Sequence, residues 1–258
     1  VSVPLYHTDM KTLETFLSNP GPENIGVIKL FQIFQSVFLF VIPALIAAWL
    51  FSTHMAGYLK ADGKASGITL ILVVLVLFAA IPAMNMFTWI NSRLDLPAWL
   101  DGIEQMMITS EENAAKLTEA FLDGRSIADL AVNLFMIAIL PAIGEEFLFR
   151  GVLQRIFTEW TRNSHWAIAI TAFVFSFVHF QFFGFLPRFL LGLLFGYLML
   201  WSASIWVPVT AHFVNNGIAV VYYHFAAQSY GETALDTWGI SGKQNYFVYI
   251  SVFLTCLL

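Results

Sequence analysis

Long apolar stretches separated by short polar loops are the main pattern of the chain. They cover residues 25–52, 68–89, 127–160, 165–183, 186–201 and 205–225, and a seventh begins at residue 245. A transmembrane helix needs roughly 20 apolar residues, so most of these stretches are long enough to cross a bilayer. We therefore predict an all-α fold, a polytopic transmembrane helix bundle with about seven spans. We expect the seventh span to be truncated within this sequence.

Two polar segments interrupt the apolar pattern. Residues 1–24 carry Leu13, Phe16 and Leu17 among polar residues, which predicts a short N-terminal amphipathic segment. Residues 93–126 are acidic, with apolar side chains at helical spacing from Trp99 onward. Thr109 and the acid three residues later form a capping-box pattern, which predicts the start of a second short helix. We expect a pair of helices on the membrane surface; a lid over the functional site is the alternative.

Composition and charge support the membrane class. The chain is 59% hydrophobic, 11% charged and has a mean hydropathy of +0.74, whereas soluble domains have about 25% charged residues. We expect residues 25–258 to form a single membrane domain with lipid around it. A net charge of −5 without a basic cluster argues against nucleic acid as a partner. A single cysteine excludes an internal disulfide.

The third apolar stretch contains ionisable residues at membrane depth. Each costs roughly 3 kcal/mol or more there, so such residues usually mark a functional site. Glu146 and Arg150 are spaced to lie on one helical face and to neutralise each other. Glu145 points about 100° away and is left for another partner. Pro141 is predicted to bend the helix and to free the carbonyl of Ile137, which neighbours or water must then satisfy.

Three further polar side chains fall within apolar stretches. His179 lies in the fourth, and His212 and Asn216 share one face of the sixth. A lone histidine or asparagine in a span usually joins helices by a hydrogen bond. A carboxylate, two imidazoles and an amide on three separate helices exceed what helix association requires. Together they offer a general base, an orienting imidazole and donors for an oxyanion.

These residues resemble the CPBP family, the CaaX proteases and bacteriocin-processing enzymes that include the type II CaaX prenyl endopeptidase. The resemblance covers residues 127–220, which we expect to be the catalytic core. It consists of three motifs in the family's order: EExxxR from Glu145 to Arg150, FxxxH from Phe175 to His179, and HxxxN from His212 to Asn216.

The resemblance implies an intramembrane endopeptidase that cleaves a peptide or protein substrate at the membrane. By analogy, Glu145 and His179 activate the attacking water, and His212 and Asn216 stabilise the oxyanion. The other motif residues are expected to support this set: Glu146, Arg150 and Phe175. We expect a multi-pass protein of a bacterial inner (plasma) membrane. The motifs carry no information on oligomeric state.

Other interpretations remain open on sequence alone. Glu145, His179 and His212 form an adequate His₂Glu ligand set for Zn²⁺. We favour a mechanism without a metal or other cofactor, because Asn216 is a poor zinc ligand and a suitable oxyanion donor. A transporter that uses the polar cluster as an ion path is one alternative to a protease. A non-catalytic immunity or scaffold protein that has kept the motifs is another.

Overall fold

The structure, a computed structural model, describes residues 21, 23–93, 96–227, 235, 237–238 and 246–257. The predicted N-terminal segment of residues 1–24 lies almost wholly outside this range, as does most of the loop before the last helix. Within the described residues the chain is helical and has no strand, which confirms the all-α prediction.

The apolar stretches of the sequence form the helices of one bundle. Among the described residues, four continuous helices are long and apolar enough to cross a membrane: Ile25–Phe51, Gly67–Asn91, Ile127–Thr161 and Phe185–Ser202. The first is made of α2 (Ile25–Ser36), a π-helical turn (Val37–Val41) and α3 (Ile42–Phe51), and the second is α5. The third combines α7 (Ile127–Asn133), α8 (Leu140–Glu146) and α9 (Gln154–Thr161) with the intervening π-helical turns Leu134–Ile139 and Phe147–Leu153.

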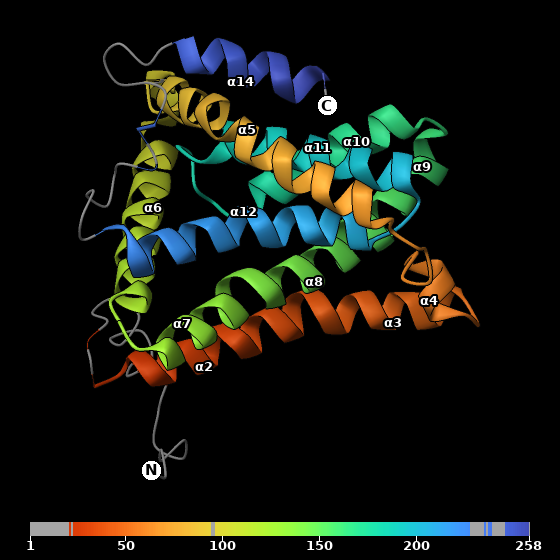
Figure 1. Ribbon diagram of the computed structural model, residues 1–258, viewed down its shortest axis with the longest axis horizontal. Coiled ribbons are helices and arrows are strands. Elements are labelled where there is room, and N and C mark those ends of the chain that lie inside the picture. The colour runs from red at the N-terminus through yellow and green to blue at the C-terminus, as the bar shows by residue number, and fades with distance from the viewer. Residues whose placement is uncertain are drawn as a thin grey trace.

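The remaining helices complete the bundle around these four. Phe185–Ser202 is α11, which packs beside the shorter apolar helix α10 (Ser164–Phe177). The others are α4 (Met55–Tyr58), α6 (Asp101–Leu122), α12 (Trp206–Phe225) and α14 (Tyr246–Leu257). In Figure 1, α5, α12 and the helices from α2 to α3 and from α7 to α8 run along one direction, whereas α6 crosses their ends steeply. The predicted all-α bundle with several helices able to span a membrane is therefore confirmed.

The polar segment after α5 differs from the sequence-based expectation. It forms a 3₁₀ turn (Ala98–Leu100) that leads into one continuous helix, α6, rather than two short helices. The hydroxyl of Thr109 donates to the carbonyl of Gln105 within the same helix, at 2.8 Å, so this side chain is not a helix cap. The prediction of a break at Thr109 was wrong because a threonine can bond back to its own helix as well as cap a new one.

The start of the third span agrees with its sequence pattern, whereas the end of the fourth does not. A serine followed three residues later by an acid predicts a helix start, and Ser126 caps α7 in a reciprocal capping box with Asp129. The fourth span is shorter than predicted, because α10 ends at Phe177 and not near residue 183. His179 therefore lies in the turn after the helix rather than within it.

The contact between α10 and α11 depends on two glycines of α11. A Cβ atom on Gly192 would lie 3.0 Å from the Cβ of Ala172, and one on Gly196 would lie 2.7 Å from Ile168 Cγ2. The backbones approach this closely only because both positions lack a side chain. The glycine pair is therefore a packing face, as its spacing predicts.

We expect Gly192→Ala to lower the stability of the protein by about 1–3 kcal/mol, because the added methyl group overpacks against α10. Thermal unfolding in detergent measures the change. Gly26→Ala is the matched control, since a Cβ at Gly26 meets nothing within 4 Å. Equal unfolding temperatures for the two variants would show that the α10–α11 contact tolerates the methyl group.

Candidate active site

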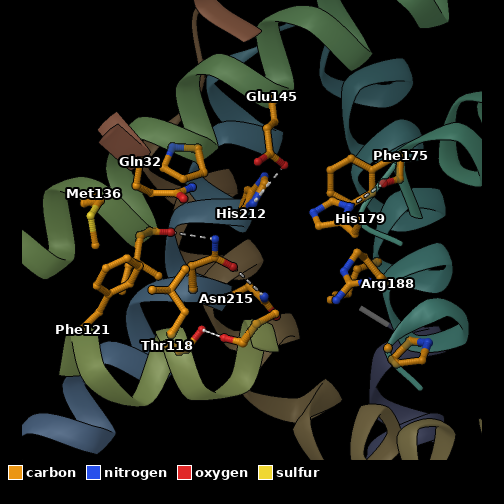
Figure 2. A pocket seen from close by; sticks show the side chains of 18 of the residues that line it. Gln32, Thr118, Phe121, Met136, Glu145, Phe175, His179, Arg188, His212 and Asn215 are labelled. Carbon is orange, nitrogen blue, oxygen red and sulfur yellow. Dashed lines mark hydrogen bonds and ion pairs between the residues drawn. The ribbon is translucent and has the colours of Figure 1, made fainter. Parts of the chain in front are cut away.

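The motif residues of three chain segments line one cavity of about 690 Å³. Glu145 enters it from α8, His179 from the turn after α10, and His212 and Asn216 from α12. Figure 2 shows Glu145, His179 and His212 around this space, with Thr118 of α6 on another side. The structure thus brings together all four side chains to which the sequence assigned catalytic roles.

Glu145 is the carboxylate that faces the cavity. Its residue is only 8% exposed, and its Oε2 lies 4.0 Å from Nε2 of His212. No side chain or backbone group of the described residues donates a hydrogen bond to the Glu145 carboxylate. The carboxylate is therefore enclosed, directed toward the cavity and available to a ligand or to water.

Glu146, the next residue, is fully buried and has a different environment. Its Oε1 accepts hydrogen bonds from Nη1 of Arg150 at 3.0 Å and from Nδ1 of His212 at 2.9 Å. Because the carboxylate accepts, Nδ1 of His212 carries the proton, and Nε2 is turned toward Glu145. The sequence predicted the pair with Arg150 but not the bond to His212, which is 66 residues away.

Arg150 connects the third span to α11. Its Nη2 donates to the carbonyl of Gly192 at 3.0 Å, and its guanidinium carbon lies 4.6 Å from the centroid of the Phe175 ring. The ring of Phe175 in turn contacts both imidazoles edge-on, with centroid distances of 5.3 Å to His179 and 5.9 Å to His212. Phe175 therefore packs between the buried cation and the two histidines.

His179 is oriented by the end of its own helix. Its Nδ1 donates to the carbonyl of Phe175 at 2.8 Å, which leaves Nε2 as the acceptor nitrogen of the neutral ring. His179 forms no ion pair within 4.0 Å of any carboxylate in the described part of the chain. A water molecule or a substrate group is needed to connect this imidazole to Glu145.

The turn that carries His179 is held from α5 and α6. The side chain of Asn91 donates to the carbonyl of Phe182 and accepts from the amide of Leu186. Glu111 of α6 accepts from the amide of Phe183 at 2.8 Å. The sequence singled out neither side chain. Since α6 also lines the cavity, it forms part of the wall of the site, and the lid stays a prediction.

Asn216 has a structural bond in addition to its place in the cavity. Its Nδ2 donates at 3.0 Å to the carbonyl of Ile137, the group that Pro141 leaves without a helical partner. Its Oδ1 accepts from Nδ2 of Asn215 at 3.1 Å, and Asn215 also lines the cavity. One N–H of the Asn216 amide is thus committed to the helix bend, and one remains for a ligand.

The two π-helical turns of the third span lie on either side of the acidic pair. One precedes Leu140 and the other follows Glu146. Such turns widen a helix locally and are frequent at functional sites. The α-helical segment Leu140–Glu146, which carries both carboxylates, is therefore flanked on each side by a widened turn.

The arrangement of donors bears on the metal hypothesis. Within the described residues, no three His, Cys, Asp or Glu side chains are grouped so that they could hold a metal ion. Nδ1 of His212 is bonded to Glu146 and Nδ1 of His179 to a carbonyl, so only the Nε2 atoms face the cavity. Glu145, His179 and His212 would therefore have to move closer together to form a tetrahedral Zn²⁺ site.

Arg188 is a cavity residue that the sequence analysis missed. It belongs to the first turns of α11 and lines the same cavity as Glu145 and His179. The signal was present, because an arginine near the start of an apolar span is itself an ionisable residue at membrane depth. It was overlooked since it lies outside the three motifs.

Comparison with known proteins supports the assignment of the core. Residues 127–218 match the family model described as type II CAAX prenyl endopeptidase Rce1-like. The family resemblance predicted from the motifs is confirmed. The uncharacterized protein YpbD of Bacillus subtilis (strain 168) is 28% identical over 97 residues, which are 36% of this chain and 47% of YpbD. The chain thus spans about half the length of this curated relative, and no solved structure matches it.

The two neighbouring carboxylates should differ sharply in their effect on stability. Glu146→Gln removes the anion that neutralises Arg150 and should cost about 3–5 kcal/mol. Glu145→Gln removes no close partner and should change stability by less than about 1 kcal/mol. Unfolding of both variants in the same detergent measures the difference. Equal losses would contradict the division into a buried network and a cavity-facing carboxylate.

Proposed function

We propose that the chain is an intramembrane endopeptidase that hydrolyses peptide bonds of membrane-associated substrates without a metal. The observation that carries this proposal is the pair of unengaged groups in one cavity: the Glu145 carboxylate and Nε2 of His179. The match of residues 127–218 to a family of prenyl endopeptidases supports it. We further propose a bacterial plasma membrane as its location, since the curated relative is bacterial.

The first step uses Glu145 and His179 to activate water. A water molecule between them donates one proton to the Glu145 carboxylate while its oxygen attacks the scissile carbonyl carbon. The imidazole of His179 accepts the second hydrogen bond of that water and fixes its direction. The C=O bond of the substrate becomes a C–O⁻ single bond, and a tetrahedral intermediate results.

The second step needs donors for the oxyanion and a proton for the leaving amine. The remaining N–H of Asn216 and a protonated Nε2 of His212 are suitable oxyanion donors, and each is expected to be worth about 10²–10³ in rate. The carboxylate of Glu146 accepts the hydrogen bond of Nδ1 and so fixes the direction in which Nε2 points. Glu145 then gives its proton to the amine nitrogen, the C–N bond breaks, and the carboxyl and amine products separate.

Glu145→Gln should lower peptide cleavage by about 10²–10⁴, because the amide cannot take a proton from water. Membranes that carry the wild type or the variant are compared by proteomics for peptides that persist uncut only with the variant. Glu119→Gln on the exposed face of α6 is the control and should cleave normally. Unchanged cleavage by a folded Glu145→Gln protein would overturn the proposal. A transporter would instead lose flux with no cleavage product affected, and a scaffold would keep its phenotype.

Chelators should leave cleavage by the purified protein unchanged if the reaction needs no metal. Elemental analysis of active protein should find zinc well below one ion per chain. The metal-free mechanism is wrong if active protein contains stoichiometric zinc, loses cleavage when the ion is removed, and regains it when zinc alone is returned.

A further inference from the structure

Arg188 enters the cavity beside His179 (Figure 2), and no described carboxylate forms an ion pair with it. Its Nη2 donates to Oε1 of Gln181, whereas its Nη1 is buried and has no hydrogen-bond partner in the described chain. No carboxylate among the described residues lies within ion-pair distance of this guanidinium. A buried cation without an anion is unfavourable, and such a group is usually completed by a ligand.

Arg150 shows what a structural arginine looks like in the same bundle. Its guanidinium bonds the Glu146 carboxylate and the Gly192 carbonyl, and the ring of Phe175 lies 4.6 Å from its guanidinium carbon. Arg188 has one neutral amide partner instead. The two arginines therefore differ in role: the first joins helices, and the second presents N–H groups to the cavity.

The side chain of Arg188 is held in position by its neighbours, although no described carboxylate forms an ion pair with it. Glu111 and Glu145 act on it electrostatically without forming a close pair. Glu111 is committed to the amide of Phe183, and that bond holds the turn before α11. The guanidinium also packs over Gly184, where a Cβ atom would lie 2.7 Å from Nη2. The cation is therefore held in place before any ligand arrives.

We propose that Arg188 binds a carboxylate of the peptide substrate and selects substrates that carry it a few residues from the cleaved bond. The inference rests on the proposed endopeptidase function and names its substrate class. A guanidinium matches a carboxylate with two parallel N–H donors. Glu145 repels a carboxylate, so the substrate's anionic end is directed away from the attacking base. A cavity of about 690 Å³ falls in the range of small-ligand sites, which suits a short peptide segment.

The carboxylate comes from the peptide C-terminus or from an acidic side chain, and three peptide sets distinguish these sources. Each set is a mass-encoded library of decapeptides with an N-terminal palmitoyl chain, added to proteoliposomes of the purified protein. The first ends in a free carboxylate, the second in a carboxamide, and the third in a carboxamide with one aspartate near the end. Cleavage is followed by mass spectrometry.

The wild type should cleave the free-carboxylate set at least about ten-fold better in kcat/KM than the carboxamide set. Recovery of cleavage with the third set would assign the role to an acidic side chain as well. Arg188→Gln should lose the preference, mainly through KM, and Arg188→Lys should keep part of it because only the charge remains. The exposed Arg162→Gln is the matched control and should behave as the wild type.

The possible outcomes distinguish failure of the Arg188 proposal from failure of the endopeptidase proposal. If the wild type cleaves all three sets equally, Arg188 is not a carboxylate anchor and the endopeptidase proposal stands. If no set is cleaved, the role of Arg188 is tested by binding instead. Thermal stabilisation of Glu145→Gln protein measures how tightly each peptide set binds. Binding without a preference for the carboxylate sets overturns the proposal for Arg188. A preference that survives in folded Arg188→Gln protein overturns it as well.

Discussion

The buried carboxylate of Glu146 is the group on which the rest of the site depends. It is fully enclosed in an apolar bundle, and it bonds a guanidinium of its own helix and an imidazole of α12 at once. Charges buried in this way are tolerated only when their partners are in place. The carboxylate therefore restricts how α12 can sit against the third span, and Arg150 extends the restriction to α11 through the Gly192 carbonyl.

The same network explains why the neighbouring carboxylate, that of Glu145, has no close partner in the described structure. Two consecutive residues on a helix point about 100° apart, so one carboxylate cannot share the environment of the other. The side chain of Glu146 points into the bundle and accepts hydrogen bonds from Arg150 and His212. Glu145 is left facing the cavity, with Nε2 of His212 at 4.0 Å. The adjacent pair thus combines a rigid anchor with a carboxylate that is enclosed but not saturated, as a general base requires.

The sequence predicted interactions between residues a few positions apart and missed those between helices that are distant along the chain. The Glu146–Arg150 pair, the Ser126 cap and the carbonyl freed by Pro141 are consequences of helical spacing within a few residues. Asn216 as the donor to that carbonyl, and His212 as the second partner of Glu146, require knowledge of how α12 packs, which spacing does not contain. The catalytic roles given to the four motif residues came from the family resemblance and stay predictions.

The errors have the same origin. A threonine followed by an acid three residues later is compatible with both a helix start and a helix interior, and only the tertiary path of α6 decides between them. The end of α10 was placed too far along the chain because the phenylalanines after residue 177 continue the apolar pattern. Their backbone is instead fixed by Asn91 and Glu111, which lie on other helices. Local hydrophobicity therefore predicted that an apolar helix forms here but not where it stops.

The proposed reaction needs water in the cavity, and α6 forms part of the cavity wall. The outward faces of the bundle carry large exposed apolar side chains, among them Phe38, Trp49 and Ile68, so lipid surrounds most of it. The cavity lining is mixed, and Thr88 and Thr118 belong to the end of the bundle where α6 crosses. A carboxylate that must meet water inside a membrane needs such a polar route, because irregular and polar groups at depth are stable only beside protein or water. Helix α6 therefore has two effects on the site. Its side chains form part of the cavity wall, and Glu111 holds the turn that positions the imidazole of His179.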